Sequence, residues 1–302
     1  MQTTKFSSKL THILRALPIT LVLVVLLSGC SFTLVPTKSI HLFLGNPSGA
    51  TESVTNSNNY LMIKPQYALS YNNSKGSANW VSWQLNKSWL GTVDRQNNFR
   101  PDDTLPEKFG RVTPTVYNGS GYDRGHIIPS ADRTKSIEDN SSTFLMTNMM
   151  PQTPDNNRKT WEGLERYCRE LVQSGKELYV VAGPLGTQGK LKGKVTIPKS
   201  TWKIVVVLDK PGAEIKDITS NTRIIAVNIP NEEGINFDWK SYRVSADKLE
   251  ELTGYNFLSN VPDKIQDEIE NKLDTQKVFN SLPRQYRKTT SNESNREVES
   301  LL

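Results

Sequence analysis

The run Trp202-Lys203-Ile204-Val205-Val206-Val207-Leu208 decides the fold class, because β-branched residues at this density favour a strand. Two similar runs lie on either side of it along the chain, at 177–183 and 223–228. Gly, Pro or Asp residues bound these runs, as is typical of strands in a sheet. The three runs therefore predict the central strands of one sheet.

Other segments add a hairpin and several helices to this sheet. Two alternating runs, 67–71 and 79–85, flank turn residues and predict the hairpin. Helical signals appear at about 155–174, 246–253 and 262–273. A strand-rich first half followed by a long helix and more strands argues against an alternating βαβ sheet. The sequence thus predicts an α+β fold.

The composition is that of a mostly soluble globule. Of 302 residues, 36% are hydrophobic and 23% charged, which is too apolar for overall disorder and too polar for repeated membrane spans. No composition break or repeat divides residues 60–274, so we expect one domain there. Residues 30–59 are expected to form a tether, and 275–302 a polar, basic, disordered tail.

Residues 1–29 have the pattern of an export signal. Basic residues precede a short apolar run, 19–27, which is shorter than a membrane span. The following Leu27-Ser28-Gly29-Cys30 resembles a lipobox, with Cys30 as the lipidated first residue. Ordinary secretion with Cys30 near the cleavage point is the alternative. We expect the protein to be secreted, periplasmic or lipid-anchored, with membrane contact only through that lipid.

The net charge of +6 does not identify a partner. The first thirty residues carry three basic side chains and no acidic ones, and the tail after residue 274 is net +2. The block 31–274 is therefore left with about +1. A nucleic-acid partner has to be argued from placed residues and not from bulk charge.

Histidine and cysteine counts exclude several kinds of site. His12 lies in the signal and His41 in the expected tether, which leaves His126 and Cys168 for the folded block. One His and one Cys cannot build a zinc site. A Cys168–His126 nucleophile pair is formally possible, but Cys168 lies in an apolar helix stripe, as a buried structural thiol would. Serine-hydrolase elbows and phosphate-binding P-loops are absent from the sequence.

The stretch 119–129 carries the first candidate site. His126 comes just before apolar residues and just after Asp123, Arg124 and Gly125. A neutral His needs an orienting partner to act as a base, and an Arg can hold phosphate. This arrangement favours phosphoryl chemistry, although a lone His is as often structural.

The helix expected at 155–174 carries the second candidate site. At about 100° per residue its buried stripe comprises Trp161, Leu164, Cys168 and Val172. Asn157 and Glu165 fall in or beside this stripe, with Arg169 at its edge. Polar groups on a packing face need partners, and a Mg²⁺ ion with its waters would satisfy both oxygens. Otherwise Asn157 is a helix-start residue and Glu165 a solvated flank.

Taken together, Asp123-Arg124-Gly125-His126 and the helix with Asn157 and Glu165 resemble the DNA/RNA non-specific endonucleases with a ββα-metal active site. Several segments look very similar to those of the cyanobacterial, sugar-non-specific members of that family. The segments that carry it are 67–86, 94–106, 121–129, 144–158 and 199–208. The resemblance implies a central antiparallel sheet flanked by helices.

The resemblance also implies a role for each matching residue. His126 would be the general base, and Asn157 the direct ligand of one Mg²⁺ or Mn²⁺ ion. Glu165 would hold that ion through a water, and Arg95 would stabilise charge on the phosphate. The remaining expected site residues are Arg124 and Arg169, which contact phosphate, and Asp123, which positions the site around His126.

The function implied is hydrolysis of DNA and RNA, single- or double-stranded, to fragments with 5′-phosphates. DNA and RNA are then the substrates, and a protein inhibitor is left open as a further partner. Two other classes of protein fit this sequence less well. An exported protein that binds nucleic acid without cutting it would not need His126 beside an acid and an Arg. A glycosidase would need a pair of carboxylates that the sequence does not place.

Overall fold

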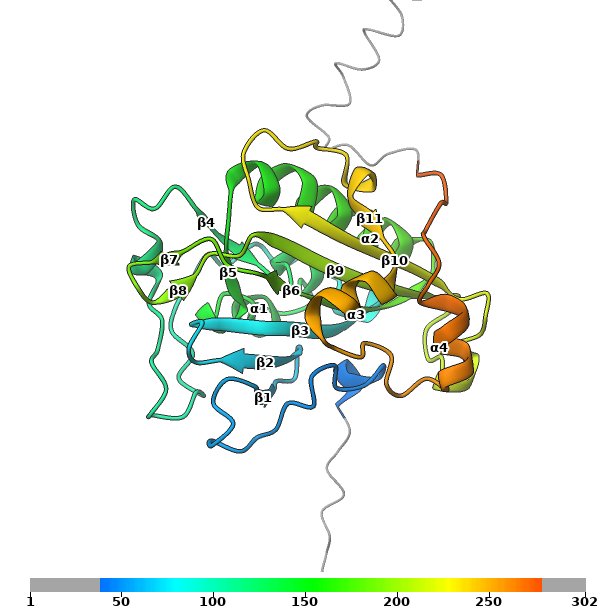
Figure 1. Ribbon diagram of the computed structural model, residues 1–302, viewed down its shortest axis with the longest axis horizontal. Coiled ribbons are helices and arrows are strands. Elements are labelled where there is room, and N and C mark those ends of the chain that lie inside the picture. Colours follow the sequence, from blue (N-terminus) through cyan, green and yellow to red (C-terminus); the bar gives the residue numbers. More distant parts are fainter. Residues whose placement is uncertain (1–38, 279–302) are drawn as a thin grey trace, which may run out of the picture. The chain divides into compact units, whose positions relative to one another are not determined.

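The computed structural model describes residues 39–278, which form an antiparallel sheet with helices on both faces (Figure 1). The seven strands, in spatial order, are β1 (Tyr60–Ile63), β2 (Ala68–Asn72), β3 (Ser77–Leu85), β6 (Glu177–Leu185), β9 (Ser200–Leu208), β10 (Arg223–Pro230) and β11 (Arg243–Val244). Every neighbouring pair is antiparallel. The predicted α+β class and its antiparallel sheet are confirmed.

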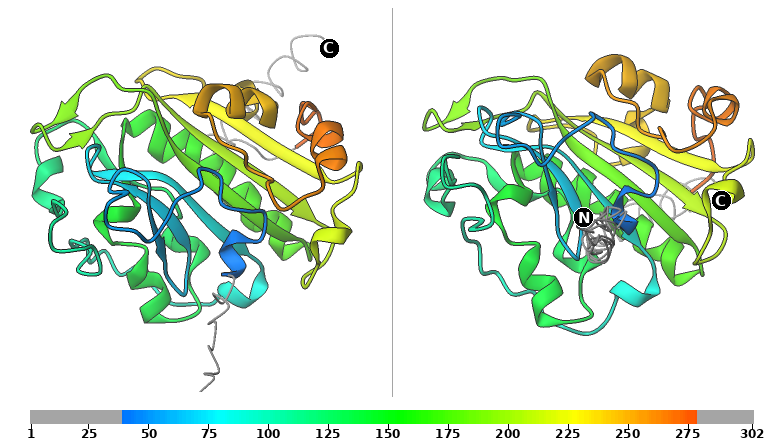
Figure 2. Two further views of the ribbon diagram at one scale, coloured as in Figure 1. Left: turned by 60° about the horizontal axis from the view of Figure 1, so that its bottom comes forward. Right: turned by 90° about the horizontal axis from the view of Figure 1, so that it is seen from below.

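Smaller elements complete the fold. Two short ribbons pair β4 (Asp123–His126) with β5 (Met149–Gln152) and β7 (Lys190–Leu191) with β8 (Val195–Thr196). The α-helices are α1 (Ile137–Ser142), α2 (Glu162–Gln173), α3 (Ala246–Thr253) and α4 (Asp263–Ile269). Figure 2 shows α2 on one face of the sheet and α3 and α4 on the other. The apolar side chains packed on this sheet accordingly form two core layers, one on each face.

Strand β9 is almost continuously apolar because both of its faces are covered. Trp202 and Ile204 belong to the core layer beneath α3 and α4. Val205 and Val207 belong to the layer beneath α2. This alternation is the period of two expected of a strand. Lys203 breaks the apolar pattern on the α2 side, where it is only 1% exposed.

The predicted hairpin and helices are present with adjusted ends. Strands β2 and β3 form the hairpin, and Gly76 in its turn has a φ of +65°, which favours glycine. Helix α3 begins at its expected cap, since the Ser245 side chain accepts a bond from the backbone N–H of Lys248. The expected helix at 262–273 is shorter, ending at Ile269, and the one at 155–174 begins with a π-helical segment.

The expected tether is wrong for residues 39–59. Leu42, Leu44 and Ala50 are buried in the core layer beneath α3 and α4. The indole of Trp80 donates to the Ser48 hydroxyl at 2.8 Å. Apolar side chains among Ser, Thr and Asn residues are enough to hold this segment, although its overall composition is that of a linker. At the other end, Val278 is also buried, so the folded part extends past residue 274.

His41 lies in this segment and is structural. It is 2% exposed, its Nε2 lies 2.8 Å from the Pro65 carbonyl oxygen, and its Nδ1 accepts from the Gln84 backbone N–H. These contacts select the neutral ring with the proton on Nε2. Burial lowers the pKa of His41 to about 4. His126 is therefore not the only His of the folded block, but both His41 ring nitrogens are already bonded.

We expect acid to destabilise the fold through His41. The unfolded chain takes up a proton near pH 6.5 and the folded chain only near the lowered pKa, so the stabilisation is complete above about pH 6.5 and is lost as the pH falls. The loss should reach about 1.4 kcal/mol per pH unit between roughly pH 6 and pH 4. Urea unfolding across this range measures it. A His41→Gln variant should have a shallower slope, and equal slopes would contradict this role.

The export signal, Cys30 and most of the basic tail lie outside the described residues. Between residues 39 and 278, no helix combines the length and apolarity that a bilayer crossing requires.

Candidate active site

The site is built on a two-stranded ribbon followed by a helix. In the β4–β5 ribbon, Asp123 lies opposite Gln152, and His126 lies opposite Met149. A π-helix begins four residues after β5 and continues into α2. The order strand, strand, helix brings the Asp123–His126 motif next to the helix that carries Asn157.

Gly125 is needed because the Gln152 side chain crosses directly over it. A Cβ at this position would lie 1.9 Å from Gln152 Oε1. Gln152 cannot easily move, since its Nε2 donates to Asn156 Oδ1 at 2.6 Å in a buried network. Any side chain between Arg124 and His126 would therefore push the two strands apart.

His126 ends β4 with its ring among aromatic side chains. Its ring centroid lies 4.8 Å from that of Phe144 and 5.6 Å from that of Phe99. The residue is 7% exposed, and within residues 39–278 its Nε2 has no hydrogen-bond partner. Burial, together with the charge of Arg95, lowers the pKa of His126 to about 3. His126 is thus neutral at physiological pH with a free ring nitrogen, as a general base must be.

Arg95 is held beside His126 by contacts that the sequence pattern did not indicate. Its Nη1 donates to the Ser130 hydroxyl at 2.7 Å, and its Nε donates to Asn97 Oδ1 at 2.8 Å. Its guanidinium carbon lies 4.8 Å from the centroid of the Phe144 ring, which also contacts His126. The charge of Arg95 is therefore fixed near the imidazole.

Asp123 contacts Asn157 and not the ring of His126. Its Oδ2 accepts from Asn157 Nδ2 at 2.8 Å, and Arg158 binds both of its carboxylate oxygens at 2.6 and 2.8 Å. Burial alone would raise the pKa of Asp123, but the bonds from Arg158 and Asn157 hold it below its usual value. Asp123 thus orients the Asn157 amide, and no described residue donates a bond to Asn157 Oδ1.

A π-helix, Asn156–Trp161, precedes α2 and changes the expected geometry of this helix. Its wider turn means that a spacing of about 100° per residue does not describe the position of Asn157. Further along, the predicted stripe is confirmed, with at most 2% exposure for Trp161, Leu164, Cys168 and Val172. Short π-helical segments such as Asn156–Trp161 are frequent at functional sites.

The Glu165 side chain lies next to the buried Lys203. Its side chain is 11% exposed, and its Oε1 lies 3.9 Å from Lys203 Nζ. Burial raises the pKa of Glu165 to about 7, although Lys203 and Arg169 oppose this shift. The ammonium of Lys203 also lies 4.0 Å from the centroid of the Trp161 ring. Sequence reasoning missed Lys203, whose signal is a single charge within an apolar strand.

Arg169 is oriented by a second buried acid. Its Nη1 lies 3.1 Å from Asp132 Oδ1, while Asp132 Oδ2 accepts from the Trp83 indole at 3.1 Å. Asp132 was not predicted, because nothing in its spacing links it to α2. Arg169 has further N–H groups that this contact does not use.

Arg124 lies on the other side of the aromatic cluster. Its Nε donates to the Pro114 carbonyl oxygen and its Nη2 to Asn118 Oδ1. The guanidinium carbon lies 5.1 Å from the centroid of the Phe99 ring, which in turn contacts His126. Arg124 and Arg95 thus both lie near the aromatic side chains that surround the imidazole.

Cys168 takes no part in this chemistry. It is a free thiol that is 2% exposed, and burial raises its pKa to about 12. A thiol that stays protonated at physiological pH is a poor nucleophile. The Cys168–His126 alternative is therefore rejected.

The structure thus brings the predicted residues together in two linked groups. Asn157 and Asp123 form one, and strand β4 joins them to the other. That second group consists of His126, Arg95, Glu165 and Arg169, which influence one another by charge. The free amide oxygen of Asn157 and the carboxylate of Glu165 are hard oxygen donors, which fit a divalent ion such as Mg²⁺.

Comparisons with known proteins identify the family of this chain. The sequence profile of the DNA/RNA non-specific endonucleases matches residues 44–264. A nuclease from Nostoc sp. is 67% identical over 262 residues, which are 83% of this chain and 96% of that protein. Human mitochondrial endonuclease G is 32% identical over 216 residues, covering 67% of this chain and 70% of that protein.

A solved structure shares the fold. The EndoG chain of an EndoG/EndoGI complex superposes with a TM-score of 0.62 at 24% identity, covering 74% of this chain and 92% of that one. Fold and site together define a metal-dependent nuclease of the ββα-metal class. The chain belongs to the DNA/RNA non-specific endonuclease family, and it is a hydrolase of nucleic acids.

Proposed function

We propose that this chain is an exported endonuclease that cuts single- and double-stranded DNA and RNA and leaves 5′-phosphates, with His126 as its general base. The observation that carries the proposal is the imidazole of His126, which is buried, neutral and without a partner at Nε2. A buried polar atom without a partner indicates that its partner arrives with the substrate.

In this mechanism each site residue has a separate role. His126 takes a proton from the water that attacks phosphorus, while the P–O3′ bond breaks and the departing 3′-oxygen takes a proton from solvent, which leaves a 5′-phosphate. Arg95, held beside the ring, stabilises the negative charge that develops on the phosphate. Arg124 and Arg169 bind neighbouring phosphate oxygens through the N–H groups that their structural contacts leave available.

One Mg²⁺ or Mn²⁺ ion would be held by Asn157 directly and by Glu165 through a water. When bound, such an ion supplies Lewis-acid stabilisation of charge on the phosphate. Asp123 keeps the Asn157 amide turned so that its oxygen stays free. The ammonium of Lys203 lies next to the Glu165 carboxylate and offsets part of its negative charge.

The same site would accept both kinds of nucleic acid. Its proposed phosphate-binding groups are arginines, and phosphates are common to DNA and RNA. Discrimination would need contacts to the 2′-hydroxyl or to base edges. The EndoG structure of similar fold comes from an EndoG/EndoGI complex that was solved to explain the inhibition of EndoG. We therefore include a protein inhibitor among the proposed partners.

Metal removal tests the proposal. With millimolar Mg²⁺ or Mn²⁺, the protein should convert both supercoiled plasmid and total RNA to short fragments, because the site binds phosphate and an ion together. Excess EDTA should stop both reactions, and added metal should restore them. End labelling should find 5′-phosphates. Cleavage in excess EDTA would contradict the metal-dependent mechanism. Digestion of only DNA or only RNA would contradict the proposed range of substrates.

Export is tested separately at the N-terminus. Expressed in a bacterium, the chain should lose its first 29 residues, because a basic segment and an apolar run precede Leu27-Ser28-Gly29-Cys30. Mass spectrometry of the mature protein should find Cys30 first, carrying the added mass of a lipid. An unmodified terminus near Cys30 would support secretion without an anchor, and an intact Met1 would contradict export.

A further inference from the structure

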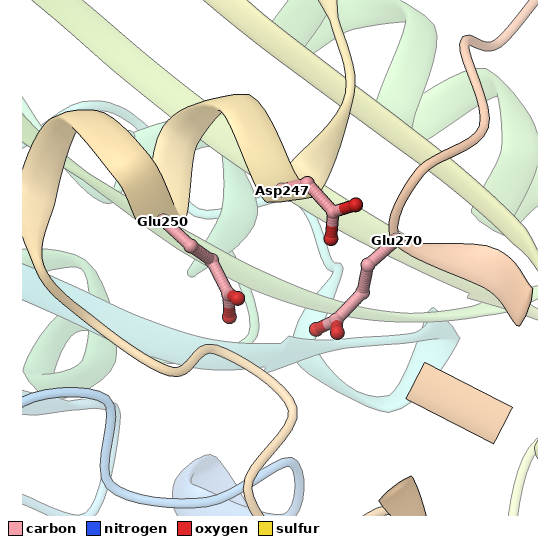
Figure 3. A group of neighbouring side chains, drawn as sticks. All are labelled: Asp247, Glu250 and Glu270. Atoms are coloured by element: carbon pink, nitrogen blue, oxygen red, sulfur yellow. The ribbon is translucent and has the colours of Figure 1, made fainter. Parts of the chain in front are cut away.

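Three carboxylates meet on the face of the sheet opposite α2 (Figure 3). Asp247 and Glu250 lie on α3, and Glu270 directly follows α4. One oxygen from each lies within 4.8 Å of the other two. Figure 3 shows the three side chains pointing into the same space. This acidic cluster belongs neither to the helix nor to the ribbon of the active site.

Glu270 is the unusual member of the cluster. The residue is only 4% exposed, and its Oε1 has no hydrogen-bond partner within residues 39–278. Its backbone carbonyl accepts from the Asp247 N–H at 3.1 Å, which joins the end of α4 to the start of α3. A buried carboxylate oxygen without a donor is costly unless a ligand satisfies it.

The described protein supplies no cation to this space. Lys248, next to Asp247 in the sequence, pairs with Glu251 at 2.8 Å instead. Lys272 donates to the Ser220 carbonyl oxygen, also at 2.8 Å. Burial, followed by the charges of Glu250, Asp247 and Asp267, raises the pKa of Glu270 to about 8. All of these neighbouring charges are negative.

We propose that Asp247, Glu250 and Glu270 form a structural Ca²⁺ site, separate from the catalytic metal site. The donors are all carboxylate oxygens, which hard cations prefer. Glu250 contributes one oxygen, since its Oε1 already accepts from the Phe257 N–H at 2.8 Å. Water can complete the shell on the exposed Asp247 side. Ca²⁺ tolerates such an irregular set, whereas Mg²⁺ demands a near-ideal octahedron.

A bound ion at this point ties two helices together. Helix α3 is anchored to the sheet by Ala246 and Leu249, and α4 by Ile269, all in the same core layer. The ion would neutralise the repulsion that otherwise pushes the helix ends apart. Binding should therefore be visible as added stability of the folded chain.

Thermal unfolding of the full chain with and without CaCl₂ tests the site. In an Asn157→Ala background, which lacks the catalytic ligand, about 5 mM CaCl₂ should raise Tm by about 3–6 °C for a site with a Kd on the order of 10⁻⁴–10⁻³ M. Adding Glu270→Gln should abolish the Ca²⁺ response without lowering Tm in the metal-free protein, because it removes a buried, repelled carboxylate. Calorimetric titration with CaCl₂ measures the binding directly.

Matched variants complete the design. Glu268→Gln, on α4 but outside the cluster, removes the same charge and should respond to Ca²⁺ like its parent. Glu250→Gln provides a second test within the cluster if Glu270→Gln does not fold. A parent protein that shows no shift and no heat of binding would overturn the proposal. An undiminished response in Glu270→Gln or Glu250→Gln, or an equal response to Mg²⁺, would also overturn it.

Discussion

The His126→Ala variant should cleave DNA and RNA about 10²–10⁴ times more slowly than the parent protein, which is the contribution expected of a general base. Its Nε2 has no partner in the described chain, and the lowered pKa keeps the ring neutral. Alanine removes the proton acceptor but leaves Arg95 and Asn157 in place. Initial rates on plasmid and on RNA at saturating metal measure the loss.

Two controls separate lost chemistry from lost folding. The Tm of His126→Ala should stay close to that of the parent, and added imidazole should restore part of the rate, because it can enter the space beside Phe99 and Phe144. The His41→Gln variant replaces the other folded His and should keep its activity at neutral pH if it folds. Full activity of His126→Ala would refute the mechanism.

The Asn157→Ala variant should lose at least about 10²-fold in rate and require more metal for half-maximal activity. Asn157 offers the free amide oxygen of the site, and its Nδ2 is bound to Asp123 at 2.8 Å. Alanine removes that oxygen and leaves Asp123 paired with Arg158. Rates measured against Mg²⁺ concentration give the half-saturation point, and Mn²⁺ binding in the presence of an oligonucleotide gives an independent reading.

Asn157→Asp is the informative companion. It keeps an oxygen ligand but loses the donor to Asp123 and places two carboxylates side by side, so its activity should lie between those of Asn157→Ala and the parent. An unchanged metal requirement in Asn157→Ala would show that Asn157 does not hold the ion.

The strands and the fold class were predictable because their signals are local. Alternation along 79–85 and the apolar run at 202–208 depend only on which faces of a strand are buried. The ends of the folded part were harder to predict. Residues 39–59 look like a linker by composition, and three apolar side chains, Leu42, Leu44 and Ala50, are what place them in the core. The helix that carries Asn157 begins close to the expected residue 155, but its first turns are π-helical, so α-helical spacing does not describe the position of Asn157.

The motif residues of the site could be found from the sequence, but their supports could not. Asp123, His126 and Asn157 stand in a recognisable order along the chain. Ser130, which holds Arg95, and Lys203, which lies under Glu165, come from segments distant from the residues they contact. A sequence pattern does not show which distant side chains meet.

The sequence alone therefore determined the α+β class and the positions of the proposed catalytic motif and of the helix proposed to carry the metal ligand. The tertiary structure alone decided that His41 is bonded and His126 is free, that Asp123 orients Asn157, and that Glu270 meets two acids of α3. The reason is physical. Strand and helix periodicity arises from neighbours along the chain, whereas burial, hydrogen bonding and pKa arise from groups that only folding brings together.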